Sequence, residues 1–345
     1  MTSSNKILQS YDYSFPSALI AQAPASPRDS AKLLVYNRAT KTTEHDVYKN
    51  ILNYLPKNGV LVLNQTKVLP ARITVTKPTG GKARLLYIKH DDKHVWMLSD
   101  RKLEIDSEVS LTKSHKFTVL QKTEQGYVLK PSFKTTQLFS ILQKYGTTPL
   151  PPYIKHSPLT GKKLLTQYNT VFAKELGSVA APTASLHFTK ALLKKISIAG
   201  IDIKYVTLHV NLGTFASLTD EQLRTQKLHE EYYEIDKTTA SFLNKAKKSG
   251  RPIIAVGTTV VRTLESAATA KHELTKLSGT TQLFINEKST LNFVDMLATN
   301  FHVPQSSLLM LVSSFTGRKE LLKIYKEAIN KKYRLFSFGD GMLVQ

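Results

Sequence analysis

The sequence predicts an α/β fold: a discontinuous α/β main domain, residues 1–66 and 151–345, with a small β-barrel domain inserted over residues 67–150. Two observations support this prediction. Residues 67–130 contain short strand-like runs separated by turn signals, whereas the flanking sequence mixes strand and helix periodicities. The sequence contains no internal repeat and no low-complexity linker, so one segment interrupting a single larger domain is the simplest arrangement.

The predicted barrel rests on five short runs rich in β-branched, aromatic and aliphatic residues. They read VLPARITV from residue 68, ARLLYIK from 83, VWMLS from 95, KFTVL from 116 and YVLK from 127. Turn signals lie between them, among them PTGG at 78–81 and EQG at 124–126. Short strands at even spacing are typical of a small closed barrel.

The flanking segments predict the elements of the main domain. Val60–Leu63 is a continuous apolar run and predicts a buried strand. An amphipathic helix is predicted over Thr189–Ile198 and a strand over Ile201–Val210, followed by a strand-turn-helix over Ile253–Ala268. These alternating strands and helices favour an α/β domain.

Composition and charge limit the function. The chain has 345 residues, 41% of them hydrophobic, and a formal net charge of +22, which favours a polyanionic partner, nucleic acid first and a membrane surface second. The positive charge is spread along the chain, and residues 67–150 carry 15 lysines and arginines against 7 acidic residues. No apolar run reaches the roughly 20 residues of a spanning helix, and the N-terminus lacks a secretory apolar segment, so we expect a cytoplasmic protein.

The absence of cysteine removes several classes of chemistry. A chain with no cysteine cannot use a cysteine nucleophile, a thiolate zinc site or a cysteine-ligated iron–sulfur cluster. His90 and His94 have a metal-like spacing, but HDDKH is a polar turn, so we predict no metal. Neither G-x-G-x-x-G after a strand nor a Walker A sequence occurs, so any nucleotide is bound in another way.

The segment GSVAAPTASLHF, residues 177–188, is the strongest candidate for a ligand site. Its apolar residues follow neither helical nor strand spacing, which indicates a tight loop that a ligand can approach. Ser178, Thr183 and Ser185 offer hydroxyls for a carboxylate, ribose or phosphate, and His187 lies where the apolar pattern resumes. The alternative is an ordinary loop before a helix cap.

A second candidate lies in TLHVNLGTF, residues 207–215. Strand alternation places Thr207 and His209 opposite the core-facing residues, just before a turn at Gly213 and Thr214. Strand ends that lead into a glycine turn are where α/β folds usually bind ligands. His209 is therefore either a general base, a donor to a leaving group, or a structural hydrogen-bonding residue.

Further acid–base candidates come from two other segments. In KLHEEYYEI, His229 and Glu231 are two residues apart, which places them on the same face of a strand, where they could act as an acid–base pair. An edge strand exposed to solvent explains the same pattern equally well. In TNFHVP, Asn300 and His302 flank a buried Phe301.

AVGTT, residues 255–259, ends a predicted strand and opens a helix. The free N–H groups at such a helix start suit a carboxylate or phosphate, so Gly257 and Thr258 are candidate anion-binding residues. Arg262 lies in the early turns of this helix, where the helix dipole disfavours a positive charge. Its presence there indicates a partner, either a ligand or Glu265, three residues further on.

Eight uncommon strings occur in a fixed order along the chain. They are YDYSFPSALIAQAPASPRDSAKLLV, GVLVLNQTKVLPARI, PLPPYI, GSVAAPTASLHF, TLHVNLGTF, VGTTVVRTLES, LATNFHVPQSSLLMLVSSF and YRLFSFGDGML. Together they resemble the S-adenosylmethionine:tRNA ribosyltransferase-isomerase family of queuosine biosynthesis along nearly the whole chain.

The resemblance implies a cytoplasmic enzyme that acts on tRNA carrying 7-aminomethyl-7-deazaguanine at the anticodon wobble position. Such an enzyme moves the ribosyl part of S-adenosylmethionine onto the aminomethyl nitrogen, giving epoxyqueuosine and releasing adenine and methionine. The family fold is an α/β domain with an inserted barrel. S-adenosylmethionine is then a co-substrate, tRNA the partner, and no metal or obligate protein partner is expected; we expect a monomer.

The resemblance also suggests residue roles. The reaction needs a base beside the sulfonium, for which His209 or the pair His229 and Glu231 are candidates. His187 or His302 would assist the departure of adenine. The residues expected to bind the co-substrate are Gly257, Thr258 and Arg262 for the methionine carboxylate, Gly177, Ser178, Ala181, Pro182 and Thr183 for sugar and base, and Gly213 and Thr214 in the following turn.

Several positions depart from the family pattern, among them Asn169, where glutamine is usual, and residues 286–288, which replace a proline-glycine turn. Gln65 stands where a carboxylate is usual, and an acidic barrel residue is replaced near Arg84. Ser185 and Asn211 replace glycines, which would narrow a ligand channel or shift a turn that needs positive φ. Two alternatives stay open: a catalytically lapsed paralogue that only binds tRNA, and a methyltransferase, which would release S-adenosylhomocysteine instead of adenine.

Overall fold

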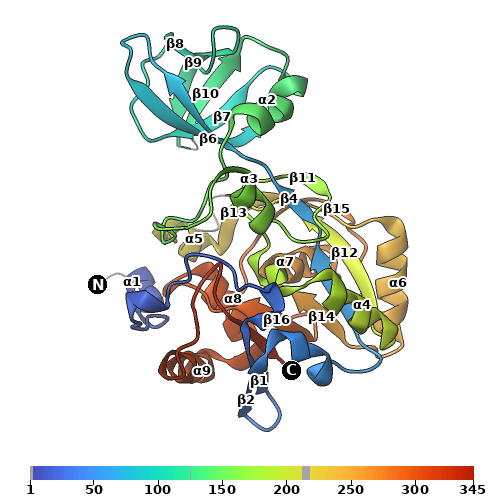
Figure 1. The fold of residues 1–345 in the computed structure, drawn as a ribbon. Helices are drawn as coiled ribbons and strands as arrows, with labels where there is room; N and C mark the ends of the chain where they lie inside the picture. The colour runs from blue at the N-terminus through green and yellow to red at the C-terminus, as the bar shows by residue number, and fades with distance from the viewer. Residues whose placement is uncertain (1–2, 125, 212–217) are drawn as a thin grey trace.

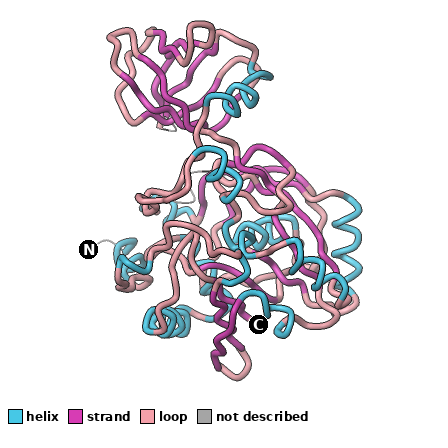
Figure 2. Tube along the Cα trace, in the orientation of Figure 1, coloured by secondary structure: helices cyan, strands magenta, loops and turns pink. Residues whose placement is uncertain are grey.

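The computed structural model describes residues 3–124, 126–211 and 218–345. A large mixed sheet flanked by helices forms the main body, and a closed six-stranded barrel projects from one end of it (Figure 1). Helices surround the sheet of the main body, whereas the barrel is mostly strand and carries α2 at its side (Figure 2). The predicted fold class, an α/β domain with an inserted β-barrel, is confirmed.

The large sheet contains parallel and antiparallel pairs. Its nine strands, in spatial order, are β15 (Ser278–Leu283), β13 (Lys227–Glu234), β12 (Asp202–Leu208), β3 (Val60–Asn64), β14 (Ile253–Val256), β16 (Met296–Asn300), β17 (Gly341–Val344), β1 (Lys32–Asn37) and β2 (Thr42–Val47). The central strands β12, β3, β14 and β16 are parallel neighbours, so their carboxyl ends lie at one edge of the sheet.

The sheet centre is buried on both faces, which explains the unbroken apolar run of β3. Val60 and Val62 face one core, and Leu61 and Leu63 face the other. The predicted strand over Val60–Leu63 is therefore confirmed.

Helices cover both faces of the sheet. The α-helices are α1 (Ser3–Gln9), α2 (Leu138–Tyr145), α3 (Gly161–Gln167), α4 (Lys190–Ile198), α5 (Asp220–Thr225), α6 (Lys237–Lys248), α7 (Thr258–Ala267), α8 (Ser307–Thr316) and α9 (Arg318–Asn330). The short 3-10 helices are η1 (Ser17–Leu19), η2 (Arg28–Ser30), η3 (Tyr48–Tyr54), η4 (Thr135–Gln137) and η5 (Thr183–His187). Helices α6 to α9 pack on one face, and α4 with η3 and η5 on the other. The predicted helix over Thr189–Ile198 is confirmed, with Thr189 as its N-cap accepting from the Leu192 N–H.

The barrel closes through antiparallel pairs. Its strands are β5 (Arg72–Thr76), β6 (Lys82–His90), β7 (Val95–Ser99), β8 (Glu108–Ser110), β9 (Lys116–Thr123) and β10 (Gly126–Pro131). Alternate residues such as Ile73 and Val75 point inward, and α2 covers the barrel core with Leu138 and Leu142. The three-residue β8 escaped prediction because its sequence, EVS, has only one apolar side chain.

The first predicted barrel run divides into two elements. Its first residue, Val68, ends β4 (Thr66–Val68), which pairs with β11 (Glu175–Ser178) beside the main body, and the rest contributes β5. The chain enters the barrel past Pro70 and returns past Gly146, where a Cβ would clash with the Pro70 carbonyl. None of the helices within the described residues is long and apolar enough to cross a membrane.

Candidate active site

A cavity of about 350 Å³ lies beyond the carboxyl ends of β14 and β16. These parallel strands are adjacent, and each is followed directly by residues of the cavity wall. Five other parts of the chain complete the wall: Leu8 and Asp12, Pro152 and Tyr153, residues 181–184, Val210 with Leu218, and Phe336 with Ser337. Its size and its place in the sheet are those of a small-molecule site in an α/β protein.

The N-terminus of α7 forms a polar corner of this cavity. Gly257 precedes the helix with φ of +91°, a conformation that suits glycine, and no side chain caps the helix. Thr258 and Thr259 line the cavity, and the Thr259 hydroxyl is buried without a hydrogen-bond partner among the described residues. A helix start with free donors attracts an anionic group.

The loop after β11 supplies another wall, as the sequence predicted for part of it. Ala181, Pro182 and Thr183 line the cavity. Ser178 does not: its hydroxyl donates to the Ala180 carbonyl at 2.7 Å and accepts from the Val210 N–H at 2.9 Å. Ser178 therefore fastens the loop to the end of β12 instead of facing the cavity.

His209 and Gly177 meet outside this cavity. The His209 ring lies so close to Gly177 that a Cβ there would be 2.9 Å from its Nε2, so glycine is required for this approach. His209 Nδ1 is 2.8 Å from the Thr66 hydroxyl, and burial lowers the pKa of the imidazole. Asn64 connects the ends of β3 and β12, since its side chain bonds both backbone groups of Leu208.

Two further candidate histidines, the buried His187 and the half-buried His302, have lowered pKa values and are neutral near pH 7. His302 lines the cavity, its Nε2 is 2.9 Å from the Thr299 hydroxyl, and burial lowers its pKa to about 3. His187 lies away from the cavity, stacks on Tyr48 with ring centroids 4.4 Å apart, and burial lowers its pKa to about 4. Both rings are therefore mainly in the neutral form at pH 7.

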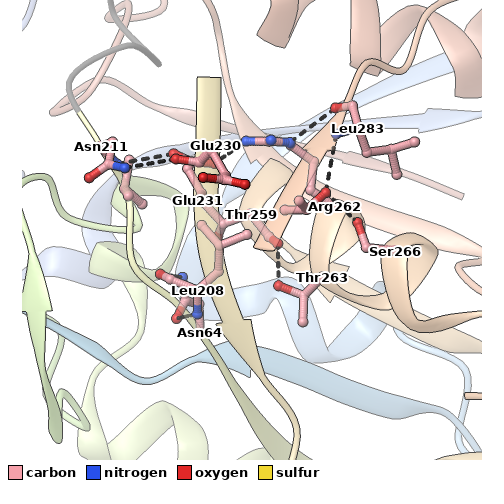
Figure 3. A network of polar contacts seen from close by, with 12 residues as sticks. Asn64, Leu208, Asn211, Glu230, Glu231, Thr259, Arg262, Thr263, Ser266 and Leu283 are labelled. Carbon is pink, nitrogen blue, oxygen red and sulfur yellow. Dashed lines mark hydrogen bonds and ion pairs between the residues drawn. The ribbon is translucent and has the colours of Figure 1, made fainter. Parts of the chain in front are cut away.

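Glu231 and Arg262 form a buried ion pair (Figure 3). Their side chains are 2% and 5% exposed, and Arg262 donates to the Glu231 carboxylate. Glu231 also accepts from the Asn211 backbone N–H at 3.1 Å, and Arg262 Nε donates to the Leu283 carbonyl at 3.3 Å. The pair thus joins β13, α7, β15 and the segment that leaves β12.

This ion pair changes two predictions. The alternative that Arg262 pairs with Glu265 is wrong, because Glu265 instead accepts from the backbone N–H groups of residues 292–294. His229 is exposed while Glu231 is buried. The pairing of β13 with β15 shifts register between Lys227 and Glu231, so the period-two face assumed for His229 and Glu231 is broken.

Two cavity residues, Asp12 and Tyr153, carried no local signal in the sequence, whereas Asn300 was singled out in TNFHVP. Asp12 is the one carboxylate among the described lining residues, and Tyr153 shares a 2.6 Å hydrogen bond with Ser337. Asn300 Nδ2 donates to the Phe336 carbonyl at 2.9 Å, while its Oδ1 is buried without a described partner. Asp12 and Tyr153 both lie in segments that carry the family resemblance, but neither the hydrophobic period nor a local motif distinguishes the residues themselves. Gly213 and Thr214 lie outside the described residues.

The departures from the family pattern at Gln65, Arg84, Ser185 and Asn211 lie outside the cavity wall. Neither Ser185 nor Asn211 has positive φ, so the described geometry at these positions does not require glycine. The Ser185 hydroxyl is buried, and Asn211 Nδ2 donates to the Glu230 carbonyl at 2.8 Å. Gln65 Nε2 is 3.4 Å from the Thr207 hydroxyl, and Arg84 is ion-paired with Asp100 at 2.8 Å. The expected narrowing of a ligand channel is therefore absent from the described cavity.

The described residues contain no group of three or more His, Asp or Glu side chains placed to hold a metal ion. His90 instead contacts the Tyr87 hydroxyl at 2.8 Å, and His94 contacts Asp91 at 3.4 Å. These two histidines make separate contacts at the end of one barrel hairpin.

The fold is that of an α/β protein with a cavity of small-molecule size at the carboxyl edge of its parallel strands. The family profile described as "Queuosine biosynthesis protein" matches residues 8–344, so the chain belongs to that family.

Named relatives extend over the whole chain. The S-adenosylmethionine:tRNA ribosyltransferase-isomerase of Carboxydothermus hydrogenoformans is 42% identical over 98% of this chain and 99% of its own length. The protein of the same name from a Sulfurihydrogenibium species is 41% identical over 98% and 99%. The crystal structure of S-adenosylmethionine tRNA ribosyltransferase from Thermotoga maritima matches with a TM-score of 0.56 and 31% identity, covering 97% of this chain and 100% of that one.

Proposed function

We propose that this protein is an S-adenosylmethionine:tRNA ribosyltransferase-isomerase. It moves the ribosyl group of S-adenosylmethionine onto the aminomethyl nitrogen of 7-aminomethyl-7-deazaguanine at the tRNA wobble position, and adenine and methionine leave. The observation that carries the proposal is a cavity in which one carboxylate, Asp12, and one anion-binding helix start, at Thr258, line the same space. This arrangement suits a ligand that carries both cationic and anionic groups.

The cavity accounts for the polar ends of S-adenosylmethionine. Its carboxylate binds at the start of α7, where Thr258 and Thr259 supply backbone donors and the unpartnered Thr259 hydroxyl. Its positive groups, the ammonium and the sulfonium, are attracted to Asp12. Arg262 is not needed for the carboxylate, since Glu231 already neutralises it.

The adenine end of S-adenosylmethionine suits the apolar part of the cavity. Phe301 and Phe336 provide apolar lining, and the buried Asn300 Oδ1 offers an acceptor for the exocyclic amine. His302, neutral at pH 7, contributes a hydrogen bond and not a full proton. Residues 181–183 bound the space left for the sugar.

We propose His209 as the base beside the sulfonium: its neighbour Val210 lines the cavity while His209 itself lies just outside the wall, so the proposal requires the ribose to extend past Val210 toward Gly177. Burial lowers its pKa, so the ring is neutral at pH 7 and able to accept a proton. The proposed role requires the tautomer in which Nδ1 donates to the Thr66 hydroxyl, 2.8 Å away, and Nε2 accepts the proton. Glu231 is a poorer candidate because its charge is committed to Arg262 and the Asn211 N–H.

The proposed RNA partner agrees with the net charge of +22. We expect a monomer in the cytoplasm, where its tRNA substrate occurs.

Product analysis tests the proposal. The protein is incubated with S-adenosylmethionine and an anticodon stem-loop carrying 7-aminomethyl-7-deazaguanine, and the small products are separated by chromatography. Adenine and methionine in equal amounts, seen only with the modified stem-loop, are expected. S-adenosylhomocysteine would indicate a methyltransferase, and tight RNA binding without any product would indicate a lapsed relative that only binds tRNA.

A further inference from the structure

A second hollow lies along α6, away from the cavity described above. It has a volume of about 770 Å³ and shares no lining residue with that cavity. Five lysines line it, namely Lys237, Lys245, Lys247, Lys248 and Lys271, together with His272 and a single acidic residue, Glu273. We call these lysines and the space between them the α6 hollow.

The charge of the α6 hollow is poorly neutralised within the protein. Lys247 pairs with Asp295 at 2.7 Å. Lys237, Lys245, Lys248 and Lys271 are exposed and take part in none of the ion pairs found among the described residues. Like charges gathered without counter-charges repel one another, and an external anion relieves that repulsion.

Helix electrostatics explain part of the cluster but not all of it. Lys245, Lys247 and Lys248 occupy the last turn of α6, where the helix dipole favours cations. Lys237 occupies the first turn of the same helix, where the dipole disfavours them, beside the N-cap Asp236. Lys271 comes from the segment after α7. Two elements thus bring cations to one hollow over the length of a twelve-residue helix.

The partner that fits this surface is the phosphate backbone of RNA. A row of lysines along a helix of about 18 Å matches several successive phosphates better than one small anion. We propose that the α6 hollow binds the sugar–phosphate backbone of tRNA outside the anticodon stem-loop. The inference rests on the proposed function, since the anticodon then occupies the separate catalytic cavity. In Figure 1, α6 forms the edge of the main body opposite α1, which contributes to the cavity wall.

The test compares full-length tRNA with the isolated anticodon stem-loop. The variant K237Q/K245Q/K248Q/K271Q removes four charges from the α6 hollow. The matched control K319Q/K326Q/K331Q/K332Q removes four exposed charges on and just after α9, at the other side of the main body (Figure 1). Both variants carry the same net charge, so any general loss of attraction to RNA is equal.

We expect the hollow variant to lose about tenfold or more in affinity for unmodified full-length tRNA, relative to the control variant. The slope of log K against log salt should fall by roughly one for each phosphate that the hollow variant no longer neutralises. Affinity for the stem-loop should be the same in the two variants. Equal tRNA affinity of both variants, or an equal loss for stem-loop and tRNA, would overturn the proposal. The proposal would also be overturned if the hollow variant lost binding to phosphatidylserine vesicles but kept its tRNA affinity. That result would indicate that the hollow binds a membrane surface.

The adenine-release assay with the modified stem-loop separates this inference from the proposed function. If the hollow binds only distal tRNA, the hollow variant releases adenine from the stem-loop reaction at the wild-type rate. If neither wild type nor variant releases adenine, the proposed function fails, and the difference in tRNA affinity still decides the inference about the α6 hollow.

Discussion

Neutralising Glu231 gives a quantitative test of how the sheet supports the site. We predict that Glu231→Gln destabilises the main domain strongly, because Arg262 would stay charged and buried without its counter-ion. The two side chains are 2% and 5% exposed, so solvent screens the pair very little. Removing one partner of a buried pair costs about 3–5 kcal/mol.

The same reasoning predicts the effect of removing both charges. In Glu231→Gln with Arg262→Met, no charge remains buried, and the methionine fills much of the space of the arginine stem. Replacing a buried pair by apolar residues is often near neutral. The double variant should therefore recover most of the loss seen in the single variant, although the Leu283 carbonyl loses the donor Arg262 Nε.

Urea unfolding measures the stability of both variants. The chain offers separate probes for the barrel and for the main body. Trp96, the single tryptophan, lies in barrel strand β7, so its fluorescence follows the barrel. Far-ultraviolet circular dichroism at the helix band follows mainly the main body, which holds eight of the nine described α-helices. Glu231→Gln should shift the dichroism transition and leave the Trp96 transition in place.

Two results would refute this reasoning. One is a Glu231→Gln protein within about 1 kcal/mol of wild type; the other is a double variant no more stable than the single one. A stable Glu231→Gln protein that releases no adenine would instead return Glu231 to the role of acid–base catalyst.

Three further predictions follow from the cavity and the buried histidines. Asp12→Asn should weaken S-adenosylmethionine binding by roughly tenfold or more in calorimetry and leave RNA affinity unchanged, because it removes one charge from the cavity wall; unchanged binding would remove Asp12 from the site. Gly257→Ala should cost about 1–2 kcal/mol in urea unfolding and weaken the same binding, since φ is +91° at the start of α7; wild-type stability and affinity would show that this backbone tolerates a side chain. His187 has a folded pKa of about 4, below the roughly 6.5 of an unfolded chain, so its stabilising contribution is complete above pH 6.5 and is lost as the pH falls toward 4. The variant His187→Phe keeps the stacking on Tyr48. Between pH 7.5 and 5, its free energy of unfolding should therefore fall by about 2 kcal/mol less than that of the wild type. An equal fall in both proteins would contradict a buried neutral imidazole.

Local periodicity was enough to predict the barrel and the strand β3. In β5 and β6 the core-facing residues alternate strictly, and β3 is apolar throughout because helices cover both sheet faces. Strand β8 was missed because three residues with one apolar side chain carry no period. The face shared by His229 and Glu231 was predicted wrongly because the irregularity lies in β13 itself, where four residues oppose two of β15, and such a shift has no signature in one sequence.

The site was predictable only where a local element points at the cavity. The start of α7 at Gly257 and the loop at residues 181–183 could be predicted as candidates because a strand–glycine–helix junction and an aperiodic loop are local patterns, and both line the cavity. Asp12 was missed because its place in the cavity depends on packing between distant segments. The Arg262 partner was missed for the same reason, since Glu231 lies 31 residues away and Glu265 was nearer in sequence.

Transfer of labelled ribose tests the central claim most directly. The protein is mixed with S-adenosylmethionine carrying ¹³C in every ribose carbon and with the modified anticodon stem-loop, and the RNA is digested and analysed by mass spectrometry. The proposed function predicts that the wobble nucleoside gains all the labelled ribose carbons while adenine leaves unlabelled. Release of adenine without label in the RNA, or label found only in S-adenosylhomocysteine, would contradict it.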